Sequence, residues 1–149
     1  MIERFEIFTN NISVVYKGIQ KLKNDKMKEF GLKGNHMMCL FYLEKHPDGL
    51  TASQLCELIG NDKAAVSRSL SELYKLDHIC YDGFTGGKKY NTVIKLTEKG
   101  KSVTSVLFDE INRTVNEISL NNMDEDHRTE FYRSLRTLAN SIKDAISTD

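Results

Sequence analysis

The stretch "NDKAAVSRSLSEL", Asn61 to Leu73, decides the fold because its two faces differ in kind. Val66, Leu70 and Leu73 recur at i, i+4 and i+7, the spacing of one face of an α-helix. At about 100° per residue, the opposite face carries small groups, hydroxyls and cations instead of the long charged side chains common on surface helices. The pattern predicts a helix that allows another molecule to approach its backbone closely. The residues of this outer face are Ala64, Ser67, Arg68, Ser71 and Lys75.

The charge around this helix is positive, although the whole chain is neutral, with 21 basic and 21 acidic residues. Residues 61–101 contain eight cations and five anions, and residues 1–30 contain six and four. Residues 109–149 contain five cations and nine anions. This uneven distribution indicates a positive surface around the bare helix, which suits a polyanionic partner. A bare face is also typical of a site where another helix packs closely, and that alternative stays open.

The chain before this stretch is predicted to form three helices. A long helix over residues 4–29 has apolar residues in a heptad-like seam, which suits packing against another long helix. A second, short helix, "NHMMCLFYLEKH", ends at Pro47, whose ring disfavours helical backbone before it. Thr51 and Gln54 form a capping box that opens a third helix, "ASQLCELI". The seam of the first helix consists of Phe5, Phe8, Ile12, Val15, Ile19 and Leu22, and the inward residues of the third helix are expected to be Leu55, Leu58 and Ile59.

Asn61 or Asp62 is expected to cap the bare helix, and a β-hairpin with a glycine-rich tip follows in residues 78–96. Thr97 and Asp124 then start two long helices. The fold class is therefore mainly α with a small β-hairpin wing, a winged helix-turn-helix between long N- and C-terminal helices. The inward residues of the first of these helices are expected to be Val103, Leu107, Ile111 and Ile118, and the apolar stripe of the last consists of Phe131, Leu135, Leu138, Ile142 and Ile146.

Three motifs at these positions resemble those of a known family. They are "LTASQLCELIG", "NDKAAVSRSLSELYKLDHI" and, about 25 residues after "VSRSL", "LTEKG" within "IKLTEKG". With flanking helices of matching length, the chain resembles the MarR (multiple antibiotic resistance regulator) family of bacterial transcription factors over essentially its whole length. The resemblance implies a homodimer that binds a pseudo-palindromic operator in double-stranded DNA. It also implies that residues 1–35 and 100–149 form a helical dimerisation region and residues 36–99 the DNA-binding region.

The resemblance makes the bare helix the recognition helix, which enters the major groove. Small outward residues allow its backbone to approach the base edges. Arg68 is expected to contact either guanine O6 and N7 or a phosphate, and both remain open. Lys63 and Lys75, near the helix ends, are expected to contact phosphates. The predicted DNA-binding residues are Lys63, Ala64, Ser67, Arg68, Ser71 and Lys75.

The predicted wing departs from the family pattern. Aligning "IKLTEKG" places Lys88, Lys89 and Tyr90 where many relatives carry Asp-x-Arg, in which the carboxylate steadies an arginine in the minor groove. Lysine lacks the planar fork of arginine, so these residues are expected to attract the DNA backbone and to read sequence weakly. Gly83, Gly86 and Gly87 are expected to keep the wing mobile until it binds.

The terminal helices are expected to pair two subunits. Half-sites one helical turn apart, about 34 Å, require a spacer of that size between the recognition helices. The alternative is that these apolar stripes are buried within one subunit. The predicted dimerisation residues are Phe5, Phe8, Ile12, Phe131, Leu135, Leu138 and Ile142.

A small aromatic or apolar ligand is a further possible partner, because the family pocket lies between the dimerisation helices and the winged domain. Its lining here is expected to include Met37, Met38 and Phe41, whose alternative role is simple core packing. No cofactor or metal is expected, because the histidines have no i, i+4 partner. The histidines are His36, His46, His78 and His127.

The three cysteines are Cys39, Cys56 and Cys80, and they lack a CxxC pairing. Reduced thiols are therefore expected, with Cys56 and Cys80 as packing residues.

The remaining function classes find little support. "GFTGG" is no P-loop, and no catalytic triad or paired carboxylates stand out, so an enzyme is not expected. No apolar run reaches 18 residues and the N-terminus does not resemble a signal peptide, so a cytoplasmic protein without a membrane partner is expected. The interpretation is a sequence-specific regulator, most often a repressor in this family. The alternatives are a winged-helix module for protein contact and a regulator of another winged-helix family.

Overall fold

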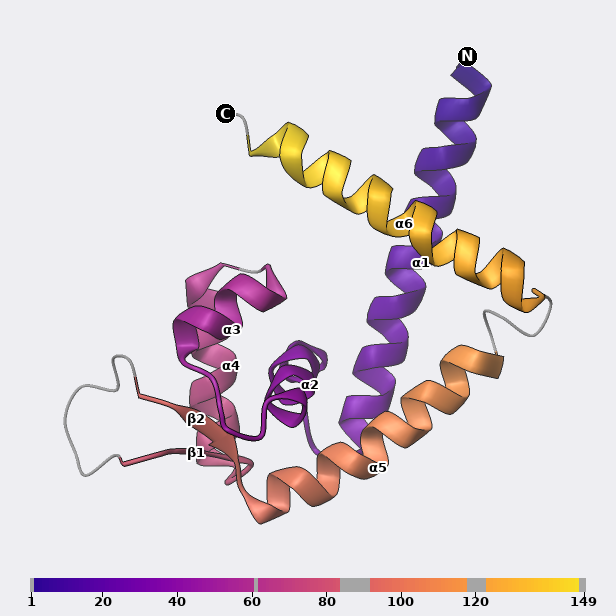
Figure 1. Ribbon diagram of the computed structural model, residues 1–149. Coiled ribbons are helices and arrows are strands. Elements are labelled where there is room, and N and C mark those ends of the chain that lie inside the picture. The colour runs from indigo at the N-terminus through magenta and orange to yellow at the C-terminus, as the bar shows by residue number, and fades with distance from the viewer. Residues whose placement is uncertain (1, 61, 84–91, 118–122, 148–149) are drawn as a thin grey trace. The chain divides into compact units, whose positions relative to one another are not determined.

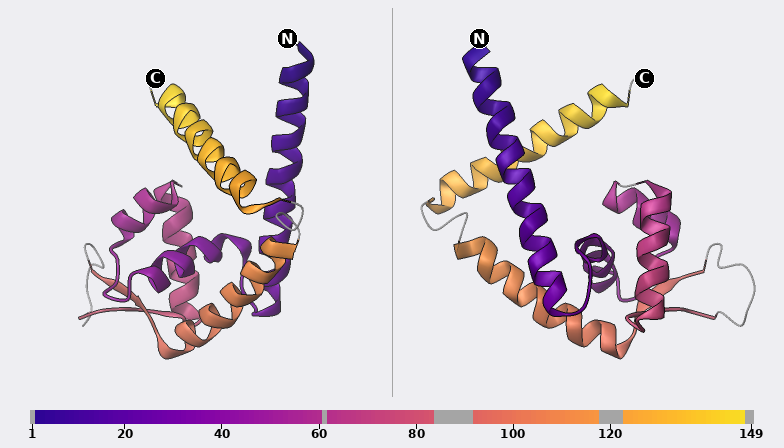
Figure 2. Two further views of the ribbon diagram at one scale, coloured as in Figure 1. Left: turned by 45° about the vertical axis from the view of Figure 1, so that its right-hand side comes forward. Right: turned by 180° about the vertical axis from the view of Figure 1, so that it is seen from behind.

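The computed structural model of the chain describes residues 2–60, 62–83, 92–117 and 123–147, with residue 115 described by its backbone alone. It divides into two compact units, Met1–Asp109 and Glu110–Asp149. Figure 1 labels the elements, and Figure 2 shows them from two other sides. In chain order they are α1 (Ile2–Glu29), the 3-10 helix η1 (Gly34–His36), α2 (Met37–Lys45), α3 (Ala52–Ile59), α4 (Lys63–Lys75), β1 (Ile79–Tyr81), β2 (Ile94–Leu96), α5 (Glu98–Val115) and α6 (Glu125–Ile146).

Side-chain caps begin the helices where the sequence predicts them. The Thr51 hydroxyl accepts a hydrogen bond from the Gln54 amide at 3.2 Å, and the Thr51 amide donates to Gln54 Oε1 at 2.8 Å. Asp62 caps α4 by accepting from the Ala65 amide at 2.8 Å, whereas Asn61 lies outside the described residues. Asp124 caps α6 in the same way. Each cap satisfies an amide that would otherwise lack a partner in the first turn, so the capping residues fix where these helices start.

The winged helix-turn-helix lies in the first unit. Helices α2, α3 and α4 cluster beside the antiparallel hairpin β1–β2, as Figure 1 shows. Leu50 joins the sheet through two hydrogen bonds with Ile94, at 2.8 and 3.0 Å. One apolar core ties these elements together, which confirms the predicted fold class. Its fully buried members include Leu40, Leu43, Leu55, Leu73, Ile79, Ile94 and Leu107.

Some predicted inward positions are wrong. Leu58 is 42% exposed, because α3 has only eight residues and its core contact is made by Leu55 in the first half of the helix. In α5 the buried side chains are those of Thr104 and Leu107, whereas Val103 is half-buried. Thr104 can be buried because its hydroxyl donates to the Gly100 carbonyl at 2.6 Å. The expected inward residue Ile118 lies outside the described residues.

Gly100 allows α5 to start directly against the chain that enters the hairpin. A Cβ at this position would lie 2.0 Å from the His78 carbonyl oxygen, a backbone atom. Gly100→Ala is therefore expected to lower the free energy of unfolding by about 1 to 3 kcal/mol, because backbone must move to admit the methyl group. Glycine to alanine inside a helix ordinarily stabilises by about 0.5 to 1 kcal/mol. Urea unfolding followed by circular dichroism measures the change.

Gly18→Ala in α1 is the matched control, because a Cβ there meets nothing within 4 Å. This variant is expected to be at least as stable as the parent chain. A Gly100→Ala variant that is as stable as Gly18→Ala would contradict the close contact with His78.

The terminal helices carry exposed apolar stripes. Along α1 only Met27 is buried, and Phe5 and Ile12 are 69% and 43% exposed. Helix α6 has no buried residue. An apolar stripe on a helix is removed from water only when another element packs against it. Among the described residues, no helix combines the length and apolar character needed to span a bilayer. The exposed apolar residues of the predicted dimerisation set are Phe5, Phe8, Ile12, Phe131, Leu135 and Ile142, and Leu138 is half-buried.

Candidate nucleic-acid interface

Helix α4 separates a buried face from a bare, exposed one. Val66, Leu70 and Leu73 are at most 2% exposed and fix the helix on the core. The opposite side is open to solvent, as the spacing predicts. No described part of the chain packs over this face, so close packing by another helix of the same subunit is ruled out within the described residues. The exposed residues of this face are Ala64, Ser67, Arg68, Ser71 and Lys75.

The cations of α4 are available to a partner. Lys63, Arg68 and Lys75 are exposed, and within the described part of the chain none of them forms an ion pair. They stand at the start, middle and end of the helix. A bare helix fits the major groove of duplex DNA, which is wide enough for an α-helix, and the cations along it complement the negative charge of the DNA backbone.

The base of the wing is held by an ion pair across the hairpin. Lys95 Nζ lies 2.7 Å from Asp82 Oδ2, and this contact lowers the pKa of the Asp82 carboxyl and raises that of the Lys95 ammonium. Gly83 follows with φ of +70°, a conformation that glycine adopts without strain. Lys88, Lys89 and Tyr90, with Gly86 and Gly87, lie outside the described residues, so the expectations about them stay predictions.

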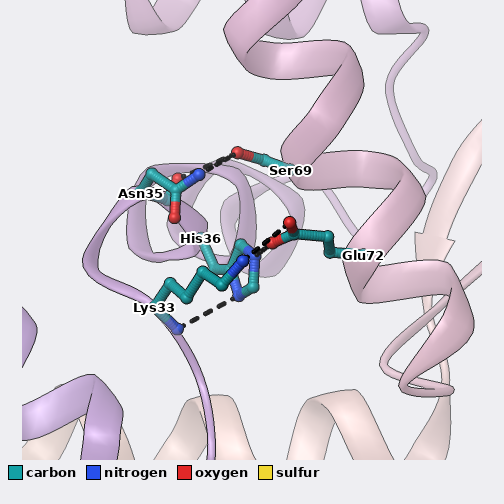
Figure 3. Close-up of polar contacts among 5 residues, drawn as sticks. All are labelled: Lys33, Asn35, His36, Ser69 and Glu72. Atoms are coloured by element: carbon teal, nitrogen blue, oxygen red, sulfur yellow. Dashed lines mark hydrogen bonds and ion pairs between the residues drawn. The ribbon is translucent and has the colours of Figure 1, made fainter.

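A polar network attaches the inner side of α4 to η1, and sequence reasoning missed it (Figure 3). Asn35 Nδ2 donates to Ser69 Oγ at 2.9 Å. One turn further along α4, the Glu72 carboxylate accepts two hydrogen bonds of 2.7 Å. Lys33 Nζ donates to Oε1 and His36 Nε2 donates to Oε2. The sequence carries one signal of this network, a serine at an inward position of α4. The structure buries that residue, Ser69, to 2% exposure.

The neighbours of His36 fix its tautomer. The Lys33 amide donates to Nδ1 at 3.3 Å, so Nε2 carries the proton and donates to the Glu72 carboxylate. Burial lowers the pKa of His36, against the opposing effect of Glu72, so the ring is neutral at pH 7. The hydrogen bonds from Lys33 and His36 lower the pKa of Glu72, which is therefore a carboxylate. The network thus joins one cation, one anion and one neutral imidazole.

A groove of about 550 Å³ lies between α1 and the segment that carries η1. Of the residues predicted to line a ligand pocket, only Met38 reaches it. Met37 is buried, and Phe41 packs edge-on against Phe108 with ring centroids 5.3 Å apart. The groove is therefore more polar than expected. Its lining residues are Tyr16, Gln20, Lys23, Asn24, Lys33, Gly34, Asn35 and Met38.

The cysteines occupy three different environments. Cys39 is buried, which raises the pKa of its thiol to about 12 and keeps it protonated. Cys56 is half-buried, consistent with packing. Cys80 is exposed on β1, so the expectation that it packs in the core is wrong: its neighbours in the strand, Ile79 and Tyr81, point to the other face. The described residues hold no group of three or more potential metal ligands.

Comparisons with known proteins agree with this geometry. Residues 30–79, from the end of α1 to the start of β1, match the model of the MarR family. No curated protein matches the chain significantly in sequence. Among solved structures, a Staphylococcus aureus MarR in complex with salicylate and kanamycin is 16% identical, with a TM-score of 0.81 over 93% of this chain and 92% of that one.

Two further structures cover the chain in the same way. A MarR regulator from Methanosarcina mazei is 22% identical, with a TM-score of 0.76 over 93% of this chain and 98% of that one. A MarR-family regulator from Listeria monocytogenes, complexed with a 26mer DNA, is 22% identical, with a TM-score of 0.75 over 91% and 89%. At these identities the similarity establishes the fold, the winged helix-turn-helix with long flanking helices.

Proposed function

We infer from the match of residues 30–79 and from the shared fold that this chain is a MarR-family transcriptional regulator, and we propose that it binds an operator in double-stranded DNA as a homodimer. The observation that carries the proposal is the outer face of α4, which is bare, exposed and lined with unpaired cations within the described chain. The related regulator from Listeria monocytogenes binds DNA, which supports the same role for this fold here. A cytoplasmic location and a repressor's mode of action complete the proposal.

Arrangement as a homodimer is supported by the stripes on α1 and α6. Several large apolar side chains along these helices are more than 40% exposed in one chain, which is costly in water unless a partner covers them. A second copy offers the same stripes, and a twofold arrangement presents two recognition helices to successive major grooves. The proposed interface residues are Phe5, Phe8, Ile12, Phe131, Leu135, Leu138 and Ile142.

Release by a small ligand is the last part of the proposal. The groove between α1 and η1 is large enough for a small molecule, and the Staphylococcus aureus relative was solved with salicylate and kanamycin. Because Lys23, Lys33 and three side-chain amides line the groove, a ligand with anionic or other polar groups fits it better than a purely apolar one.

Arg68→Ala tests the DNA contact of α4. The operator duplex is first selected from random sequence by the purified protein, and affinities are then measured by fluorescence anisotropy on this duplex and on a scrambled one. If Arg68 reads a guanine, the affinity for the operator is expected to fall by about 5- to 140-fold and the affinity for scrambled DNA to fall much less, because a bidentate contact is worth about 1 to 3 kcal/mol.

Equal losses on both duplexes would assign Arg68 to a phosphate. Affinity for the operator should also fall steeply with salt, because phosphate contacts release counterions. If the protein selects no duplex at all, the winged helix serves protein contact instead and the proposed function is wrong.

A further inference from the structure

Glu72 is the only acidic residue within α4, and it lies one helical turn after Arg68. Side chains four residues apart in a helix are neighbours, so an arginine and a glutamate at this spacing attract each other. An Arg68–Glu72 pair would bend the guanidinium back along α4 and cancel its charge. In the described structure that pair does not form.

The reason lies in the contacts that Glu72 makes outside α4. Both carboxylate oxygens of Glu72 are occupied, Oε1 by Lys33 Nζ and Oε2 by His36 Nε2, each at 2.7 Å. The partners approach from η1 and the residue before it, so the carboxylate is drawn toward η1 (Figure 3). His36 is 1% exposed and its ring is fixed by the Lys33 amide, which makes this contact directional.

We propose that Lys33 and His36 are positioning residues that hold the Glu72 carboxylate away from Arg68 and so keep the Arg68 guanidinium free to bind DNA. Lys33 also neutralises the one negative charge of α4, which would otherwise repel the phosphates beside the groove. The inference rests on the proposed function, since DNA binding by α4 is its consequence. It adds a role for residues that lie outside the DNA-facing side of α4.

Lys33→Met tests the proposal, because it removes the ammonium and keeps an apolar stem of similar length. On the selected operator duplex the dissociation constant is expected to rise about 3- to 30-fold, the range typical of changes that act through another residue. The same substitution is expected to change affinity less than twofold in a Glu72→Gln background, because no carboxylate is left to attract the Arg68 guanidinium. The same small change is expected in an Arg68→Ala background, because no guanidinium is left for Glu72 to attract. Lys33→Arg keeps a positive charge beside Glu72 and is expected to keep the operator affinity of the parent chain.

Lys28→Met is the matched control, because Lys28 is an exposed lysine near the end of α1. It is expected to change affinity less than twofold. A loss from Lys33→Met that persists in the Glu72→Gln background would show that Lys33 contacts phosphate itself and would overturn the proposal. An unchanged affinity of Lys33→Met in the parent chain would also overturn it.

A measurement without DNA separates this inference from the proposed function. The Nε–Hε resonance of Arg68 is followed by ¹⁵N NMR in the free protein. It is expected to shift in Lys33→Met, where Glu72 becomes available to Arg68, and to stay in place in Lys33→Met with Glu72→Gln. If the resonance does not respond to Lys33→Met, the inference is wrong even where the protein binds DNA. If it responds but no duplex is selected, the inference holds and the proposed function is wrong.

Discussion

Replacing Leu135 and Ile142 of α6 together by glutamate is expected to turn a dimer into monomers and to weaken operator binding at least about 100-fold. Both side chains lie on the exposed stripe of α6, at 43% and 48% exposure. In a dimer interface each new carboxylate would be buried without a partner, which costs several kcal/mol. Loss of the dimer then removes the gain from binding two linked half-sites, which is typically about 100- to 10,000-fold.

Sedimentation equilibrium and fluorescence anisotropy measure the two effects. The parent protein is expected at twice the chain mass of 17.1 kDa and the double variant at that mass itself. Thr137→Glu with Asn140→Glu is the matched control, because these residues lie on the opposite face of α6 and are exposed. A parent protein that sediments as a monomer at micromolar concentration would refute the dimer. A double variant that stays dimeric would refute the α6 stripe as its interface.

Ala64→Glu is expected to reduce operator affinity at least about 100-fold while leaving the fold intact. Ala64 is exposed on the outer face of α4, so a longer side chain there can extend into solvent without disturbing the core. A glutamate at this position also lies one turn before Arg68 and can attract its guanidinium. Against DNA it would hold the helix away from the base edges and set a carboxylate among phosphates. Such a juxtaposition of like charges costs several kcal/mol, and each 1.4 kcal/mol is a tenfold loss.

Ala64→Ser is the control, because serine keeps the face small and uncharged, and an affinity within about threefold of the parent is expected. Circular dichroism should show the same thermal unfolding for all three proteins to within a few degrees. If Ala64→Glu binds the operator as well as the parent chain does, α4 does not enter the groove by its outer face.

The parts of the fold that follow from local pattern could be predicted from the sequence. Caps at Thr51, Asp62 and Asp124 and the two faces of α4 depend on neighbours within a few residues, and the structure confirms them. The helical period predicts a helix over residues 97–118, whereas α5 ends at Val115 and Ile118 lies outside the described residues. Leu58 was assigned inward by period alone, which cannot tell how far the core extends along a short helix.

The candidate site could be predicted only on its outer side. The exposed cations and small residues of α4 are visible in the spacing of one segment. The contacts of Asn35 with Ser69 and of His36 with Glu72 join residues 34 and 36 positions apart, and nothing local signals such pairings. The groove beside η1 likewise depends on how α1 meets η1. Of the predicted pocket residues Met37, Met38 and Phe41 it contains Met38 alone, and the rest of its lining is mainly polar.

The division of α4 into two faces has a consequence for how the proposed DNA specificity could change. Its attachment to the rest of the subunit uses Val66, Ser69, Leu70, Glu72 and Leu73, none of which is among the residues open toward a partner. Substitutions at positions 64, 67, 68 and 71, other than by glycine or proline, are therefore expected to cost little folding stability. If α4 binds DNA as proposed, the same four positions are where a laboratory library for altered specificity should be randomised.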